Sequence, residues 1–209
     1  MIEVELQGKT CINMRQVLLV LSVTILVLFS SKGFAQKANA FGLKIGVEKP
    51  FITSSTEHLK YANELGFNVG FAWYRYQSEK VFFNFNSSIH YYNAKIHEVT
   101  IGSHLPPISE NSFAGSAELL FAYVLAGDLA LVSGYSFLYN SEYTKMWYAK
   151  ENHSIPVGLD YKIDNNHLAF KYYLPLQKNE FDLYWTGNPD RIYETTRFHR
   201  IELSYVITF

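Results

Sequence analysis

Residues 200–209 read RIELSYVITF, and this stretch decides the fold. One face of the stretch collects the apolar residues Ile201, Leu203, Tyr205, Ile207 and Phe209. The residues between them are mostly polar, and Arg200 and Glu202 are charged. A period of two is typical of a β-strand whose two faces meet different environments. We therefore predict a strand over 196–209 with one apolar and one mostly polar face.

The same alternation occurs, more weakly, along the preceding sequence. It predicts seven further strands, at about 41–48, 65–76, 80–93, 111–125, 128–140, 156–163 and 167–175. The links between strands alternate strictly in length: the short ones are 77–79, 126–127 and 164–166, and the long ones are 49–64, 94–110, 141–155 and 176–195. An up-and-down barrel with both termini at one end produces this alternation. The predicted fold class is all-β, an eight-stranded antiparallel up-and-down transmembrane β-barrel.

The N-terminal region has the features of an export signal. Residues 17–29 read VLLVLSVTILVLF, with Arg15 before them and the small residues Gly33 and Ala35 after them. A helix of this length spans roughly 20 Å, which is short of a ~30 Å hydrocarbon core. We expect a secretory signal peptide over 1–35, with Met14 as the start and cleavage after Ala35. The barrel domain is then 36–209, and an uncleaved membrane anchor is the alternative.

Composition excludes several kinds of chemistry. The formal net charge is −1, so no basic surface argues for nucleic acid as a partner. The single cysteine, Cys11, precedes the expected domain, which therefore has no disulfide and no cysteine metal site. No glycine-rich phosphate loop is present, and we expect no cofactor.

The two faces of the predicted strands differ in charge. The face expected to meet lipid is almost free of charge, whereas the inward face carries Asn84, Asn86, His90 and six residues expected to form a structural ion-pair network: Glu118, Asp160, Lys162, Lys171, Arg200 and Glu202. Unpaired charges in a narrow lumen are costly, so these groups should pair. An eight-stranded barrel is only wide enough to be filled by side chains. Aromatic girdles are expected from Trp73, Tyr91, Tyr123, Tyr139 and Tyr172.

Catalysis and metal binding are weaker interpretations. His153, Ser154 and Glu151 could activate a hydroxyl at the outer rim, as a lipid A-modifying enzyme would, but adjacent strand residues point to opposite faces. His90, His97 and His104 recur every seven residues, with no accompanying cluster of ligands. We therefore expect no enzyme, no catalytic residue and no metal site.

Two further interpretations stay open. The loop aromatics Phe181, Tyr184 and Trp185 suit either a binding tip or the outer girdle. A soluble periplasmic barrel holding an apolar ligand is the alternative to a membrane barrel, and it would place the apolar side chains inside.

The chain resembles the PorT-like eight-stranded outer-membrane barrels of Gram-negative, Bacteroidetes-type bacteria. The resemblance rests on the processing site Phe34-Ala35-Gln36, the alternating strands, and Phe209 with its alternating apolar residues. It implies location in the outer membrane, contact with outer-membrane lipid, and a barrel-insertion signal in Ile201, Leu203, Tyr205, Ile207 and Phe209 that the barrel-assembly machinery reads. It also implies a non-catalytic role: structural, surface-binding, or accessory to an envelope or secretion assembly.

Overall fold

The computed structural model describes the backbone of residues 39–54, 59–99, 108–140, 151–183 and 192–209. Side chains are described for 39–53, 64–92, 113–140, 151–178 and 195–209. The expected signal peptide lies outside the described residues. No helix among the described residues is both long and apolar enough to cross a membrane.

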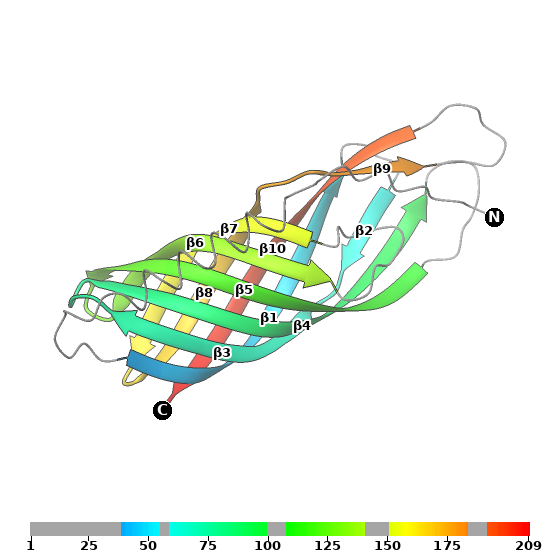
Figure 1. Ribbon diagram of the computed structural model, residues 1–209. Helices are drawn as coiled ribbons and strands as arrows, with labels where there is room; N and C mark the ends of the chain where they lie inside the picture. The colour runs from blue at the N-terminus through cyan, green and yellow to red at the C-terminus, as the bar shows by residue number, and fades with distance from the viewer. Residues whose placement is uncertain (1–38, 55–58, 100–107, 141–150, 184–191) are drawn as a thin grey trace.

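Eight antiparallel strands close into a barrel (Figure 1). In chain order they are β1 (Asn39–Ser54), β3 (Gly66–Tyr76), β4 (Val81–Val99), β5 (Ile108–Ala126), β6 (Leu129–Asn140), β7 (Glu151–Ile163), β8 (Asn166–Pro175) and β10 (Ile192–Thr208). Each strand pairs with the next, and β10 returns to pair with β1 from Gly42↔Thr208 to Ser54↔Thr196. The predicted fold class is confirmed.

Two short strands lie within the predicted links 49–64 and 176–195. β2 (Leu59–Asn63) pairs with the far end of β4, and β9 (Asn179–Leu183) pairs with the beginning of β10. Both lie at the end of the barrel that carries the long links (Figure 1). The expected links 49–64, 94–110 and 176–195 are therefore corrected, because regular strand pairing continues well beyond the predicted strand ends.

A further correction to a strand boundary concerns β7, which begins at Glu151 and not at 156. Pro156 lies inside the strand and has no N–H to donate to the ladder. The recorded pairing of β6 with β7 accordingly skips from Ser133↔Val157 to Ser136↔Ser154 without a change of register. A proline is an ordinary sign of a strand's edge, which explains why the sequence pattern placed the boundary too late.

Tight turns form the opposite end of the barrel. Gly127 has φ 54° and Asp164 has φ 56°, both in the left-handed region that glycine and Asp tolerate best. These turns join β5 to β6 and β7 to β8. The β3–β4 turn is closed by the Gln77 amide, which donates to the Val81 carbonyl at 2.9 Å.

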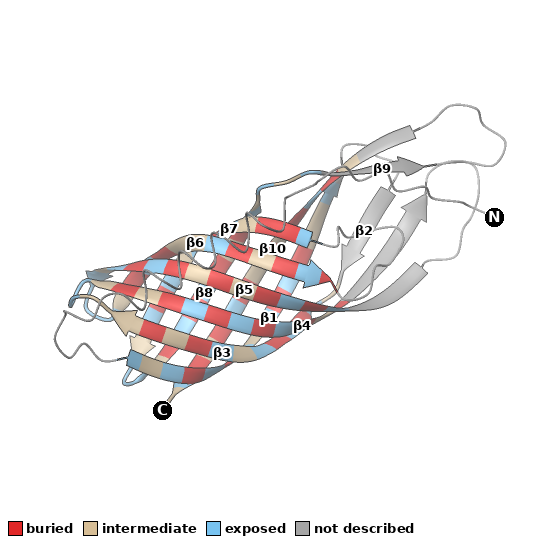
Figure 2. Ribbon diagram, in the orientation of Figure 1, coloured by how far each residue is buried: buried red, intermediate tan, exposed pale blue. Residues whose placement is uncertain are grey.

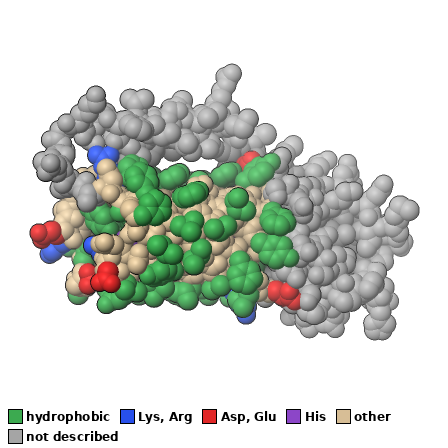
Figure 3. Space-filling view, turned by 90° about the horizontal axis from the view of Figure 1, so that it is seen from below, with side chains coloured by type: hydrophobic (Ala, Val, Ile, Leu, Met, Phe, Trp, Pro, Cys, Tyr) green, Lys and Arg blue, Asp and Glu red, His purple; other side chains and the backbone are tan. Residues whose placement is uncertain are grey.

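Buried and exposed residues alternate along the strands, which gives the barrel wall a chequered appearance (Figure 2). The exposed residues include large apolar side chains, among them Phe71 at 68% and Ile89 at 63% exposure. They form a hydrophobic belt around the described barrel, and the view in Figure 3 shows this belt with charged groups confined to its two ends. Greasy side chains on the outside and polar ones inside are what a lipid-facing barrel requires.

Two inward-facing glycines allow neighbouring strands to approach closely. A Cβ placed on Gly158 would lie 2.0 Å from the Phe170 carbonyl oxygen, and one on Gly134 would lie 2.0 Å from that of Leu119. Gly115, in contrast, has open space where its Cβ would be. Gly158 and Gly134 are therefore required for close packing, not for an unusual backbone angle.

Candidate functional site: a sealed lumen

The centre of the barrel is filled by an ionic cluster, which we define as Lys44, Glu48, His90, Glu118, Lys171, Arg200 and Glu202. All of these side chains are buried, and they come from β1, β4, β5, β8 and β10. The three carboxylates balance the three permanent cations. Charge balance matters here because an uncompensated ion in a water-poor interior carries a penalty of several kcal/mol.

Glu118 on β5 receives donors from several walls. Its Oε2 lies 2.8 Å from Lys171 Nζ and accepts from Asn86 Nδ2 at 3.2 Å. Its Oε1 accepts from Arg200 Nη2 at 3.1 Å and from the Tyr173 hydroxyl at 2.7 Å. Both carboxylate oxygens are therefore satisfied by charged or strong donors, as a buried carboxylate requires.

Glu202 forms the second centre of the cluster. Lys44 Nζ lies 2.9 Å from its Oε1, and Lys171 Nζ lies 2.9 Å from the same atom. Asn68 Nδ2 donates to its Oε2 at 3.2 Å. Lys171 thus bridges Glu202 and Glu118, which joins the two carboxylates into one network.

The end of the cluster nearest the long links is built around Glu48. His90 Nδ1 lies 2.8 Å from Glu48 Oε1, and His90 Nε2 lies 2.7 Å from the Ser116 hydroxyl. Arg200 Nη1 lies 3.5 Å from Glu48 Oε2 and donates to the Tyr92 hydroxyl at 3.1 Å. Both nitrogens of the imidazole are occupied, so His90 serves the network and has no free position for a ligand.

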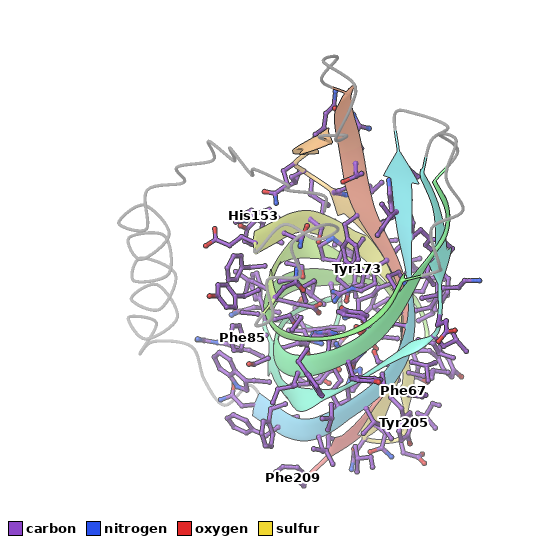
Figure 4. All side chains as sticks on the ribbon, turned by 90° about the vertical axis from the view of Figure 1, so that its right-hand side faces the viewer. Phe67, Phe85, His153, Tyr173, Tyr205 and Phe209 are labelled. Atoms are coloured by element: carbon purple, nitrogen blue, oxygen red, sulfur yellow. The ribbon has the colours of Figure 1, made fainter. Side chains whose placement is uncertain are left out.

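Aromatic rings complete the seal. The Arg200 guanidinium lies 3.7 Å from the centroid of the Tyr173 ring, a short cation–π contact. Figure 4 shows Tyr173 inside the barrel, with Phe67, Phe85 and Tyr205 on its outer surface. The Tyr173 ring covers one face of the Arg200 guanidinium. It also fills space that the ionic side chains leave empty.

The end of the lumen next to the tight turns is mainly apolar. A buried hydrophobic cluster occupies it, made of Ala72, Tyr74, Phe82, Ala122, Ala130, Val132 and Val206. Within it His167 Nδ1 lies 2.7 Å from Asp160 Oδ1, and the imidazole stacks on Tyr74 at a centroid distance of 4.0 Å. A cavity between this cluster and the ionic cluster has a volume of ≈ 10 Å³. That is about the room for one water, far too small for a passage.

The structure separates the six residues expected to share one ion-pair network. Glu118, Lys171, Arg200 and Glu202 lie together in the ionic cluster. Asp160 instead pairs with His167 nearer the tight turns. Lys162 has its ammonium 5.7 Å from the Tyr76 ring centroid and forms no ion pair among the described residues, because it lies at the β7–β8 turn.

Sequence reasoning missed two members of the ionic cluster and gave no pairing role to a third. Lys44 and Glu48 lie on β1 between Leu43, Ile45 and Val47, in the same alternation that marked the other strands. That alternation was a sufficient signal for their inward orientation. His90 was expected to face inward, but its partners come from strands distant in the sequence.

The residues expected to act as an insertion signal lie on the outer face of β10, with Phe209 directly after the strand. Leu203, Ile207 and Phe209 are exposed, and Ile201 and Tyr205 are half-buried. The Phe209 amide donates to the Phe41 carbonyl at 2.9 Å, next to the β1–β10 pairing. Recognition of these side chains by assembly machinery stays a prediction.

The residues considered for catalysis do not converge. His153 is on the outward parity of β7 but is buried, and its Nδ1 shares a hydrogen bond with the Tyr135 hydroxyl. Ser154 is on the inward parity of the same strand, and Glu151 is exposed. Among the described residues no group of three His, Cys, Asp or Glu side chains is placed to hold a metal. The side chains of His97, His104, Phe181, Tyr184 and Trp185 lie outside the described residues.

Comparison with known proteins agrees with this architecture. No family model matches the sequence, and no curated protein matches it. The crystal structure of the outer membrane protein OprG from Pseudomonas aeruginosa matches 83% of this chain and 97% of its own, at a TM-score of 0.51 and 9% identity. The fold is that of an outer-membrane β-barrel. The solid-state NMR structure of the outer membrane protein AlkL in lipid bilayers covers 87% of this chain and 96% of its own, at a TM-score of 0.45 and 15% identity. At these identities the likeness establishes the fold alone.

Proposed function

We propose that this protein is an integral outer-membrane protein of non-catalytic type, whose sealed barrel anchors a surface-binding structure. The observation that carries the proposal is the ionic cluster, in which Glu118 on β5 is joined to Arg200 on β10 across the full width of the lumen. A barrel closed in this way gives rigidity and membrane residence. Among the described residues, it leaves no continuous route for solute along the barrel axis.

The apolar belt supports placement in a membrane over the soluble alternative. A soluble barrel that holds an apolar ligand would face its apolar side chains inward and its ionic ones outward. Here the charged side chains Lys44, Glu118 and Glu202 are buried while Phe71 and Ile89 are exposed. An exposed apolar surface of this extent marks a contact with membrane or protein, and its distribution over all eight strands of the barrel favours acyl chains.

Surface binding is supported by the strands that continue past the barrel at the end bearing the long links. β4 and β5 stay paired as far as Ile96↔Ile108, and β2 and β9 add to the edges of β4 and β10. Such an extension costs a protein ordered backbone outside the membrane. A binding platform, with a structural role or a role in an envelope or secretion assembly, accounts for this strand extension. A barrel that served only as a membrane anchor does not.

The proposal is tested by fractionation together with conductance. Recovery in the outer-membrane fraction, release only by detergent, and heat-modifiable migration on a denaturing gel are expected. The purified protein in a planar bilayer should show no stable unitary conductance. Recovery in the soluble periplasm contradicts membrane placement, and a steady open channel contradicts the sealed lumen.

The finer assignment to PorT-like barrels, with cleavage after Ala35 and insertion by the barrel-assembly machinery, is part of the same proposal. N-terminal sequencing of the mature protein should begin at Gln36. Replacing Phe209 by Ala should lower the amount of folded barrel in the membrane without changing its heat-modifiable migration, because the signal acts during assembly. An unchanged yield contradicts the signal.

A further inference from the structure

We propose that the seam between β1 and β10 carries, on its lipid-facing side, a binding site for the phosphorylated headgroup of an outer-leaflet lipid. This proposal rests on the membrane placement proposed above. The site, which we call the seam patch, consists of Lys49, Thr53, Tyr172, Arg197 and His199.

Strand register places the seam patch on one face. Lys49 pairs with Ile201, Phe51 with His199, and Thr53 with Arg197, so the odd-numbered residues of both strands point outward together. Lys49 and Arg197 are exposed. Their backbones are four residues apart along the pair, about 13 Å, a distance that two long side chains can close on a common anion from opposite sides.

The residues between the two cations are fixed in position. Tyr172 Oη lies 2.7 Å from His199 Nδ1, and the two rings stack at a centroid distance of 5.9 Å. Thr53 Oγ1 lies 3.4 Å from His199 Nε2. Lys49 Nζ lies 5.6 Å from the centroid of the Phe51 ring, so the ammonium leans toward the gap. The floor of the patch is preorganised while its two cations stay exposed.

Neither cation of the seam patch has a counter-charge among the described side chains of the surrounding wall. Lys49 and Arg197 form no ion pair among the described residues, and no described side chain that points outward from β1, β3, β8 or β10 is a carboxylate. The exposed carboxylate of Glu151 is on β7, beyond β8. Two unpaired cations on one side of the rim complement a phosphate, and each basic group near a charged membrane surface contributes about 1 kcal/mol.

The occupant is an amphiphile because the seam patch borders the belt. Towards the tight turns the same face continues as Val47 and Ile45 on β1 and as Leu203 and Ile207 on β10, all exposed. A strand crosses the hydrocarbon in about 9–11 residues, and the distance from Arg197 to Ile207 matches that span. A lipid would place its phosphate at the patch and its chains along the belt. Free inorganic phosphate would bind only at the seam patch and would make no contact with the belt.

The test is a titration of the purified full barrel in a neutral detergent. Lipid A bisphosphate, its fully dephosphorylated form and inorganic phosphate are the three probes, and native mass spectrometry measures occupancy. The double variant Lys49→Gln, Arg197→Gln should bind lipid A bisphosphate roughly 30-fold more weakly, about fivefold per cation. The matched control, Lys80→Gln, Lys162→Gln, removes the same charge at the opposite end and should bind as the unaltered protein does.

The outcomes separate the lipid site from the proposed function. Preference for the bisphosphate that disappears in the seam-patch variant supports the site. Equal binding of the phosphorylated and dephosphorylated forms, or equal binding by the variant, overturns the lipid site. If the same protein is still recovered in the membrane as a heat-modifiable barrel, the proposed function stands. Inorganic phosphate that binds as tightly as the lipid also overturns the lipid site. Absence of the protein from the membrane overturns both.

Discussion

Arg200 on β10 and Glu118 on β5 stand on opposite walls of the barrel, four strands apart either way around the sheet, with Nη2 and Oε1 separated by 3.1 Å. A single ion pair therefore spans the lumen. Its members also reach the neighbouring cations and carboxylates, so that removal of one group changes the charge balance of all of them.

Replacing Glu118 by Ala should strongly destabilise the barrel. Lys171 and Arg200 would lose their shared carboxylate and stay buried, a situation that costs about 3–5 kcal/mol. Urea-induced unfolding from lipid vesicles, followed by tryptophan fluorescence, measures the change in the free energy of unfolding. Glu79→Ala in the exposed β3–β4 turn is the matched control and should change it by less than about 0.5 kcal/mol. Equal values for the two variants would contradict the network.

Removing both members of the cross-lumen pair should cost less than the two single replacements together. Glu118→Leu and Arg200→Leu each leave the ionic cluster with one unbalanced charge, whereas the double variant leaves it balanced. A coupling of about 0.5–3 kcal/mol is expected between contacting residues. The same unfolding measurement provides it, and the pair Glu118→Leu with Lys80→Leu should be additive. Additivity in the first pair would show that the groups act independently.

The cost in free energy of an arginine on the lipid face should depend on its depth in the membrane. Ile89 is 63% exposed and pairs with Val69 of β3, which pairs with Ile45 of β1. Ile45 is next to Lys44 of the ionic cluster, so we expect Ile89 to face the middle of the membrane. Ile89→Arg should cost about 2–4 kcal/mol in the free energy of unfolding. Ile163→Arg, next to the β7–β8 turn, should cost only about 0–1 kcal/mol. Equal costs at both depths would argue against a membrane around this belt.

Replacement of glycine by alanine should change the stability of the barrel differently at Gly158 and at Gly115. Gly158→Ala places a Cβ 2.0 Å from the Phe170 carbonyl oxygen, so β7 and β8 must separate, and overpacking of this kind costs about 1–3 kcal/mol. Gly115→Ala meets open space and should be neutral or slightly stabilising because alanine restricts the unfolded chain. Thermal loss of the heat-modifiable form ranks the two variants. The reverse ranking would contradict the described packing.

The sequence predicted the fold well because membrane and lumen impose opposite demands on alternate residues. RIELSYVITF shows both demands, and the last strand was located on that basis, although β10 begins four residues earlier than the predicted 196. The pattern failed at β7, where Pro156 imitates a strand end and His153 breaks the apolar face. It also gave no sign that the lumen changes from ionic to apolar near the tight turns, because Tyr74, Phe82 and Val206 are apolar like the residues that face lipid.

The candidate site was harder to predict than the fold. Alternation indicated which charges point inward, but it carries no information about which of them meet. Lys44 and Glu202 are 158 residues apart in the sequence, yet Lys44 Nζ lies 2.9 Å from Glu202 Oε1. Only strand order and register bring them together, and sequence patterns constrain both weakly. For the same reason Asp160 and Lys162 were grouped with residues that they do not contact.

The closure of β1 onto β10 also joins charges from the two ends of the barrel's sequence. Lys44 and Glu48 arrive with the first strand to be made, while Arg200 and Glu202 arrive with the last. Until β1 and β10 meet, the charges on each strand lack counterions from the other. Complete desolvation of the barrel's interior therefore requires this closure, because unpaired charges must otherwise stay hydrated.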